Sequence, residues 1–174
     1  PPIVFVPPGF RPLVSEYGRG NNEKKMVNPI LVQFSHPDTW VAQTTSVNNN
    51  GESGTVGAND YIKGDSANLF EYKLKSGESP STSSKNLYQN IIEAALGRKG
   101  DVLESVKVLQ VDALPPGLKG EKYFRTYFSY SLNTEAGFLI ARQGIMSTVE
   151  INGFAENIIT GTTSKRWKQK MEPI

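Results

Sequence analysis

The sequence predicts an α+β fold, in which helices pack on an antiparallel β-sheet. Two observations carry this prediction. Most of the chain consists of runs that alternate apolar and polar residues between turn-rich segments, a pattern typical of strands joined by hairpins. One segment in the middle of the chain instead repeats its apolar residues at helical spacing. A second, short and basic helix is expected near the C-terminal end.

Prolines dominate the start of the chain, where residues 1–29 hold six of the eleven. Because proline fixes φ and lacks a backbone donor, residues 1–28 are predicted to form an extended arm in front of a domain at residues 29–174. The arm carries Phe5, Phe10 and Arg11. Either the arm packs on its own domain, or these residues dock it on a partner. The sequence leaves both interpretations open.

The segment ILVQFSHPDTWVAQTT predicts a strand, a tight turn at Pro37 and Asp38, and a second strand. The first strand follows from the alternation of Ile30, Val32 and Phe34. Further strands are expected at NLFEYKL, ESVKVLQV, KYFRTYFSYSL and GFLIARQGIMSTVEI. The third of these places four large apolar side chains on one face: Phe124, Phe128, Tyr130 and Leu132.

Asn152-Gly153 between two β-rich runs predicts a two-residue hairpin. A type I′ turn needs positive φ at both central residues, which Asn and Gly tolerate best.

Residues 85–96, KNLYQNIIEAAL, are predicted to form a helix. Ser84 is the expected N-cap, and Gly97 suits the C-terminal end. The preceding KSGESPSTSSKN is of low complexity, which is typical of a mobile loop. The apolar stripe of the helix consists of Leu87, Tyr88, Ile91, Ile92, Ala95 and Leu96.

The C-terminal TTSKRWKQKM predicts a short helix with Thr163 or Ser164 as N-cap. Trp167 shares a helical face with Met171 and Ile174, so either it packs under the sheet and the basic residues on the other face are merely solvated, or that basic face binds a partner. Basic residues in a first helical turn oppose the helix dipole, which leaves room for binding to an acidic partner. The candidate binding residues are Lys165, Arg166, Lys168 and Lys170.

The composition excludes several classes of function. Cysteine is absent, which excludes disulfides and thiol nucleophiles, and His36 is the single histidine. His36, Ser35 and Asp38 are too close in sequence to converge as a catalytic trio, so we expect no enzymatic activity. A net charge of +2 is too small for a nucleic-acid-binding surface. His36 and Asp38 are weak candidate metal ligands without a second ligand set.

The segment ANDYIKGD contains two further carboxylates, Asp60 and Asp65. They are predicted either to cap a loop or to line a low-affinity cation site.

Several motifs in order resemble the PsbP family of photosystem II extrinsic proteins. They are FSHPDTW, the middle helix followed by YFRTYFSYSL, and the late hairpin followed by IITGTTSKRW. The resemblance covers roughly residues 29–171 and is closest in kind to the divergent PsbP-domain and PsbP-like proteins. The loops at 48–60 and 76–85 and the proline-rich arm depart from the family's pattern.

The resemblance implies an antiparallel sheet sandwiched between helices and a place in the chloroplast thylakoid lumen, peripheral on the lumenal membrane face. It implies a non-catalytic protein that supports the oxygen-evolving complex and its calcium and chloride retention, without a tightly bound cofactor. The expected partners are the photosystem II core and other extrinsic subunits. The alternative is a lumenal assembly factor absent from the mature complex.

Overall fold

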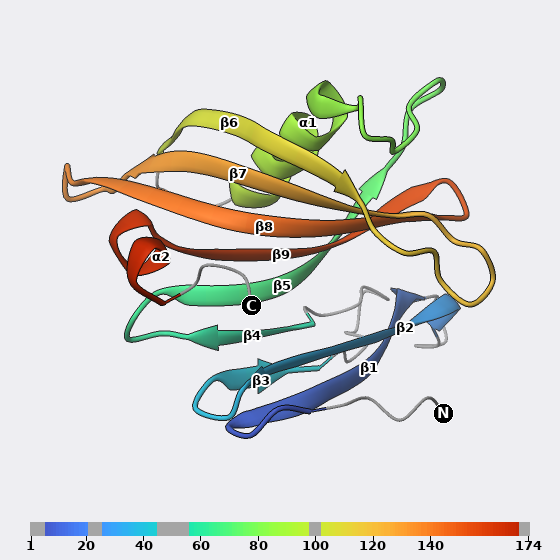
Figure 1. Ribbon diagram of the computed structural model, residues 1–174, viewed down its shortest axis with the longest axis horizontal. Coiled ribbons are helices and arrows are strands. Elements are labelled where there is room, and N and C mark those ends of the chain that lie inside the picture. The colour runs from blue at the N-terminus through green and yellow to red at the C-terminus, as the bar shows by residue number, and fades with distance from the viewer. Residues whose placement is uncertain (1–5, 21–25, 45–55, 98–101, 171–174) are drawn as a thin grey trace. The chain divides into compact units, whose positions relative to one another are not determined.

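The structure is a computed structural model that describes residues 6–20, 26–44, 56–97 and 102–170. By its internal contacts the chain divides into two units, Pro1–Leu69 and Phe70–Ile174. Figure 1 labels the helices and strands of both units.

The first unit begins with a two-stranded antiparallel ribbon. Strand β1 (Phe10–Gly20) pairs with β2 (Met26–Pro37), with Phe10 opposite Pro37 and Leu13 opposite Phe34. Two short strands follow, β3 (Val41–Gln43) and β4 (Gly57–Asp60), which pair with each other in antiparallel register. Strand β4 also pairs with the first half of β5 (Asp65–Lys73).

Residues 10–20 therefore form a paired strand, and the boundary expected between residues 28 and 29 falls inside β2. The sequence did not predict this strand, because its prolines interrupt the alternation of apolar and polar residues that is typical of strands. In a two-stranded ribbon both strands are edges, and an edge strand tolerates a residue without an N–H. Pro12 lies within β1, opposite Ser35.

The ribbon has one covered and one exposed face. Leu13, Val32 and His36 are buried, and Phe34 is half-buried, as the alternation in β2 predicts. The opposite face carries the exposed side chains of Phe10, Val14 and Leu31.

The second unit is a mostly antiparallel sheet with strand order β5-β9-β8-β7-β6. Its strands are β6 (Val102–Ala113), β7 (Tyr123–Asn133), β8 (Leu139–Ile151) and β9 (Phe154–Thr163), and the second half of β5. Strands β6 to β9 pair as successive antiparallel neighbours. The sheet confirms the predicted antiparallel architecture.

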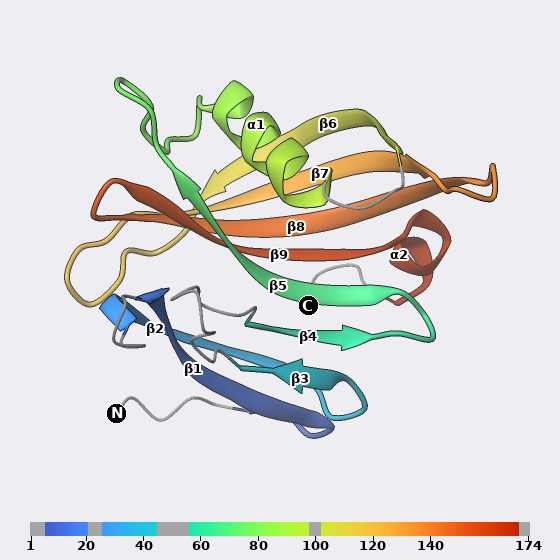
Figure 2. The ribbon, with the colours of Figure 1, turned by 180° about the vertical axis from the view of Figure 1, so that it is seen from behind.

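Helix α1 (Lys85–Leu96) covers one face of this sheet, as Figure 2 shows. Its apolar stripe packs on side chains that strand periodicity brings to the same face. The buried core consists of Leu87, Tyr88, Ile91 and Ile92 of the helix and Phe124, Phe128, Tyr130, Met146, Ala155 and Ile159 of the sheet.

A buried polar row crosses this core. The Thr148 hydroxyl donates to Asn157 Oδ1 at 2.7 Å, and Asn157 Nδ2 donates to the Phe70 carbonyl at 3.0 Å and the Ala155 carbonyl at 2.9 Å. Every polar group of the Asn157 side chain is thereby satisfied, as burial demands. These hydrogen bonds link β8, β9 and β5.

Two local predictions at chain turns are confirmed. Asn152 (φ 52) and Gly153 (φ 80) both have positive φ in the turn between β8 and β9. Thr163 Oγ1 accepts the Arg166 N–H at 3.4 Å, so Thr163 caps helix α2 (Ser164–Lys170).

The predicted side-chain cap of α1 is wrong. Ser84 occupies the N-cap position with φ −82 and ψ 43 but makes no capping hydrogen bond, and its hydroxyl donates to the Ser79 carbonyl at 2.7 Å. The segment predicted to be a mobile loop is instead built from hydrogen-bonded turns. Lys75 N–H donates to Glu78 Oε1 at 2.8 Å, and the Ser81 and Ser84 hydroxyls share a hydrogen bond of 2.7 Å.

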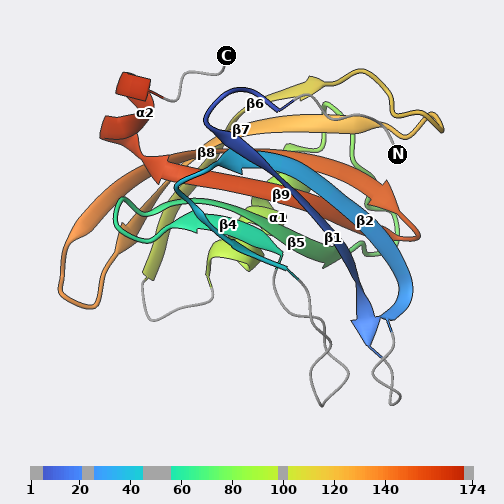
Figure 3. The ribbon, with the colours of Figure 1, turned by 90° about the horizontal axis from the view of Figure 1, so that it is seen from below.

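The expectation that helices cover both faces of the sheet stays a prediction. The described residues supply α1 along one face and a seven-residue α2 at the end of β9 (Figure 3). Neither of these two helices has the length and apolar character that crossing a membrane requires.

Candidate interaction surface

Helix α2 carries the predicted cationic cluster at one end of the second unit. Lys165 and Lys168 are exposed, and Arg166 and Trp167 are half-buried. Within the part of the chain that the structure describes, neither lysine makes a hydrogen bond or an ion pair with another residue. Lys170 lies in the last turn of α2, but its side chain is outside the described set. The exposed lysines are therefore available to a partner.

A further cation near α2, Arg142, is already engaged. Arg142 lies opposite Thr163 in the β8–β9 ladder, directly before α2. Its Nε donates to the Tyr130 hydroxyl at 2.7 Å, and its guanidinium carbon lies 5.9 Å from the centre of the Tyr130 ring. These two contacts hold the Arg142 side chain against Tyr130 of the neighbouring strand β7.

Exposed apolar side chains lie at the same end of the sheet. Phe138 is 68% exposed, Leu139 66% and Val102 57%. Val102 pairs with Asn133, and Asn133 pairs with Leu139, so Val102 and Leu139 lie in one row across three strands. Leu139 precedes Arg142 by three residues, roughly 10 Å along β8.

We call the residues Val102, Phe138, Leu139, Lys165 and Lys168 the α2 end. Figure 1 shows α2 and the β7–β8 hairpin tip at the same end of the second unit. Large exposed apolar side chains next to free cations are typical of a surface that binds a partner.

The hairpin tip of the α2 end is held in a defined conformation. Phe138 N–H donates to Thr134 Oγ1 at 3.1 Å, and Thr134 N–H donates to the Phe138 carbonyl at 2.9 Å. Gly137 supplies the positive φ, 83°, that closes the turn. Phe138 is therefore presented by an ordered backbone, which lowers the entropy lost when a partner binds it.

The predicted contact residues of the arm lie in the first unit. Phe10 and Arg11 are exposed at the start of β1, and Phe5 lies outside the described residues. Together with Val14 and Leu31, Phe10 belongs to the exposed face of the ribbon.

The candidate metal ligands have different environments. His36 is buried, and its Nδ1 lies 2.8 Å from the Pro37 carbonyl oxygen, to which a protonated Nδ1 donates. Asp38 is exposed in the turn after β2. Nowhere in residues 6–20, 26–44, 56–97 and 102–170 do three or more His, Asp or Glu side chains gather as metal ligands would.

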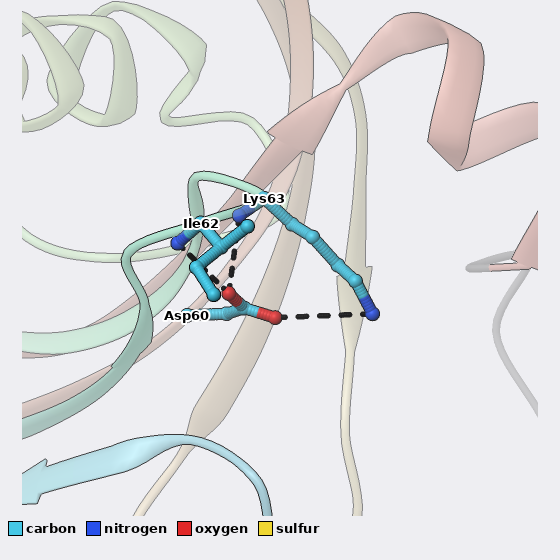
Figure 4. Close-up of polar contacts among 3 residues, drawn as sticks. All are labelled: Asp60, Ile62 and Lys63. Atoms are coloured by element: carbon cyan, nitrogen blue, oxygen red, sulfur yellow. Dashed lines mark hydrogen bonds and ion pairs between the residues drawn. The ribbon is translucent and has the colours of Figure 1, made fainter.

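The Asp60 carboxylate caps a turn (Figure 4). Its Oδ1 accepts the N–H groups of Ile62 and Lys63, both at 3.0 Å, and its Oδ2 lies 4.0 Å from Lys63 Nζ. Asp65 is buried at the start of β5. Of the two interpretations of this loop, the structure supports capping.

Sequence reasoning missed the apolar part of the α2 end. Phe138 and Leu139 belong to GFLI, which has the pattern of a buried strand start. The adjacent NTEAG, rich in turn residues and ending in Gly137, was the sequence signal of a hairpin tip. In the structure Gly137 has a positive φ of 83.

No protein-family model matches this chain, and no curated protein is significantly similar to it. Among solved structures, it is similar to cyanobacterial PsbP from Synechocystis sp. PCC 6803, with a TM-score of 0.49 and 13% identity over 78% of this chain and 76% of that one. It is also similar to PA94 from Pseudomonas aeruginosa, described as a protein of unknown function and putative regulator. That TM-score is 0.39, with 14% identity over 82% of this chain and 90% of that one. TM-scores below 0.5 at such identities establish neither a common fold nor a common function.

Proposed function

We propose that this protein is a non-catalytic, PsbP-like extrinsic protein that docks on the lumenal face of photosystem II. In this role it supports the oxygen-evolving complex and its calcium and chloride retention. One observation supports the proposed docking: the exposed lysines of α2 lie at the same end of the second unit as the exposed Phe138 and Leu139. The ordered motifs FSHPDTW, YFRTYFSYSL and IITGTTSKRW support the family and the thylakoid lumen as its location.

The two parts of the α2 end have different physical roles. Lys165 and Lys168 attract acidic loops of the partner and orient the encounter. Phe138, Leu139 and Val102 supply apolar area that leaves water in the docked state and adds to the affinity. Docking of this kind weakens at high salt, because screening acts on the charges and leaves the apolar contacts in place.

The ribbon of the first unit offers a second contact. Phe10 is exposed at the start of β1 on the same face as Val14 and Leu31, and Arg11 is exposed on the other face, opposite His36. In the proposal, Phe10 is an apolar anchor and Arg11 pairs with a partner carboxylate.

The experiment is retention on isolated photosystem II complexes washed at low and then at high salt. We expect retention at low salt and release at high salt. The double variant Lys165→Glu/Lys168→Glu should lose retention by tenfold or more, as two charge reversals imply. The matched control, Lys107→Glu/Lys119→Glu, changes two exposed lysines of the same unit away from α2.

Each result bears on a different part of the proposal. Equal retention of the α2 variant and its control would remove the α2 end as the docking surface. Absence from mature complexes but presence in assembly intermediates would replace the extrinsic-subunit role with that of a lumenal assembly factor. Absence from both would overturn the photosystem function.

A further inference from the structure

A small cavity lies at the end of the second unit opposite to α2. It has a volume of about 310 Å³ and is lined by Ser79, Pro80, Lys122, Phe124 and Glu150. In Figure 2 the loop before α1 and the turn between β8 and β9 lie together at this end. The volume is at the lower bound of pockets that bind small molecules.

The wall of the cavity is an ordered loop. The Ser79 carbonyl accepts the Ser84 hydroxyl at 2.7 Å, and the Ser81 carbonyl accepts the Tyr88 hydroxyl at 2.9 Å. Tyr88 is fully buried in the core under α1. These bonds anchor Ser79 and Pro80 to the first turns of the helix, so the wall is in place before any ligand arrives.

The floor of the cavity is apolar. Phe124 is 7% exposed and belongs to the core cluster, and Pro80 is buried. The accessible edges of these two rings form the apolar part of a lining that also contains Ser79, Lys122 and Glu150.

Two opposite charges flank this floor. Tyr123 pairs with Val149, so the next residues in line are Lys122, directly before β7, and Glu150 in β8, on the same face as Phe124. Both are exposed. Among the described residues, neither side chain makes a hydrogen bond or an ion pair, with the other or with a third group.

We propose that this cavity binds a zwitterionic α-amino acid with an apolar side chain. The ligand's carboxylate pairs with the Lys122 ammonium, and its ammonium group pairs with the Glu150 carboxylate. Its side chain covers Pro80 and Phe124, and the Ser79 side chain, which also lines the cavity, supplies a donor to the carboxylate. A simple anion or a simple cation satisfies one of the two charges and is repelled by the other.

The proposal rests on different residues from the docking function. The cavity and the α2 end share no side chain, so each idea can fail without the other.

The test is a titration of the ¹⁵N-labelled protein, residues 1–174, with L-leucine, followed through the amide chemical shifts of the cavity residues. We expect saturable shifts at Ser79, Phe124 and Glu150, with a dissociation constant on the order of 1 mM for so small a ligand. The single-charge analogues 4-methylpentanoate and 3-methylbutylamine should bind at least about tenfold more weakly, since each lacks one charge-assisted hydrogen bond.

Two variants and two matched controls complete the design. Lys122→Met and Glu150→Gln remove one charge each and keep the shape of the side chain, so each should weaken leucine binding about tenfold or more. Lys107→Met and Glu104→Gln make the same chemical changes at exposed positions of β6 and should leave binding unchanged. The proposal is overturned if leucine causes no saturable shifts, if both analogues bind as well as leucine, or if the cavity variants match their controls.

Discussion

Phe128 lies directly opposite Gly144 in the β7–β8 ladder, and its ring occupies the space that a side chain at residue 144 would need. A Cβ added at Gly144 would lie 2.6 Å from Phe128 Cζ and would also collide with the Thr160 carbonyl oxygen. The Thr160 hydroxyl adjoins this contact, since it accepts the Ile145 N–H at 3.1 Å and donates to the Ile145 carbonyl at 2.9 Å. The aromatic ring thus shields a strand glycine at the centre of the core.

Replacing Gly144 with alanine should therefore lower the free energy of unfolding by about 1–3 kcal/mol, the range for overpacking a core. Urea denaturation gives this value directly. Ala141→Ser, at an exposed position of the same strand, is the control and should change it little. A Gly144→Ala variant as stable as the parent would mean that Phe128 moves aside without loss.

The hairpin at Asn152 and Gly153 gives a second prediction. Gly153→Ala should destabilise the protein by about 1–2 kcal/mol, because a residue with a Cβ is strained at φ 80. Asn152→Gly should be nearly neutral, since glycine adopts a φ of 52 without strain. Thermal unfolding followed by circular dichroism compares the two variants, and equal melting temperatures would contradict the assignment of a type I′ turn.

The Asp60 turn gives a third prediction. Asp60→Ala removes the acceptor of two backbone N–H groups and should cost about 1 kcal/mol of stability. Asp60→Asn keeps one acceptor oxygen and serves as the matched variant, with a smaller loss. If Asp60 instead held a cation, calcium would raise the melting temperature of the parent and leave that of Asp60→Asn unchanged.

Tyr88 gives a prediction about pH. Burial raises the pKa of Tyr88 from 10.0 to about 12. Between these values the unfolded chain has lost the phenol proton and the folded protein retains it, so the unfolded state binds fewer protons and stability falls as pH rises. The contribution is fully present below pH 10 and is lost as pH approaches 12, with a total on the order of 2–3 kcal/mol.

Urea denaturation of the parent and of Tyr88→Phe between pH 8 and 12 isolates this contribution from that of the other tyrosines. The variant should be less stable at pH 8, because the Ser81 carbonyl loses its donor. The difference should shrink as pH rises from 10 to 12. A difference that stays constant across this range would show that Tyr88 titrates normally.

The apolar part of the α2 end gives a fifth prediction. Phe138→Ser/Leu139→Ser should reduce retention on photosystem II at low salt and leave the free energy of unfolding nearly unchanged, because both side chains are mostly exposed. Leu109→Ser, at a 53% exposed position of β6 outside both proposed contacts, tests whether any loss of exposed apolar area has the same effect. Retention that survives the double change would restrict docking to the lysines.

Local patterns in the sequence predicted much of the second unit. The stripe at 85–96 became α1, and the even-numbered aromatic residues of β7 became its packing partners. These predictions hold because periodicity within one element decides which face becomes apolar. The lysines of α2 were predictable for the same reason, since a short amphipathic helix leaves its polar face to solvent.

Predictions that depended on pairing between distant segments were less complete. Strand β1 was not predicted because prolines interrupt its pattern, and Ser84 makes no capping hydrogen bond but donates to the Ser79 carbonyl. Val102 and Leu139 join one surface because β7 lies between them, and Lys122 meets Glu150 through the β7–β8 register. Nothing within either segment specifies its neighbour.

By itself, the sequence determined the kinds of element in this protein, the sharp turn at Asn152-Gly153 and the absence of cysteine chemistry, since these follow from single residues and short spacings. Only the tertiary structure decided which strands are neighbours, that Phe128 covers Gly144, and which charged and apolar side chains gather at the two ends of the second unit. The reason is physical: strand register depends on hydrogen bonds and packing between segments far apart in the chain, and a shift of one residue would move every side chain to the other face.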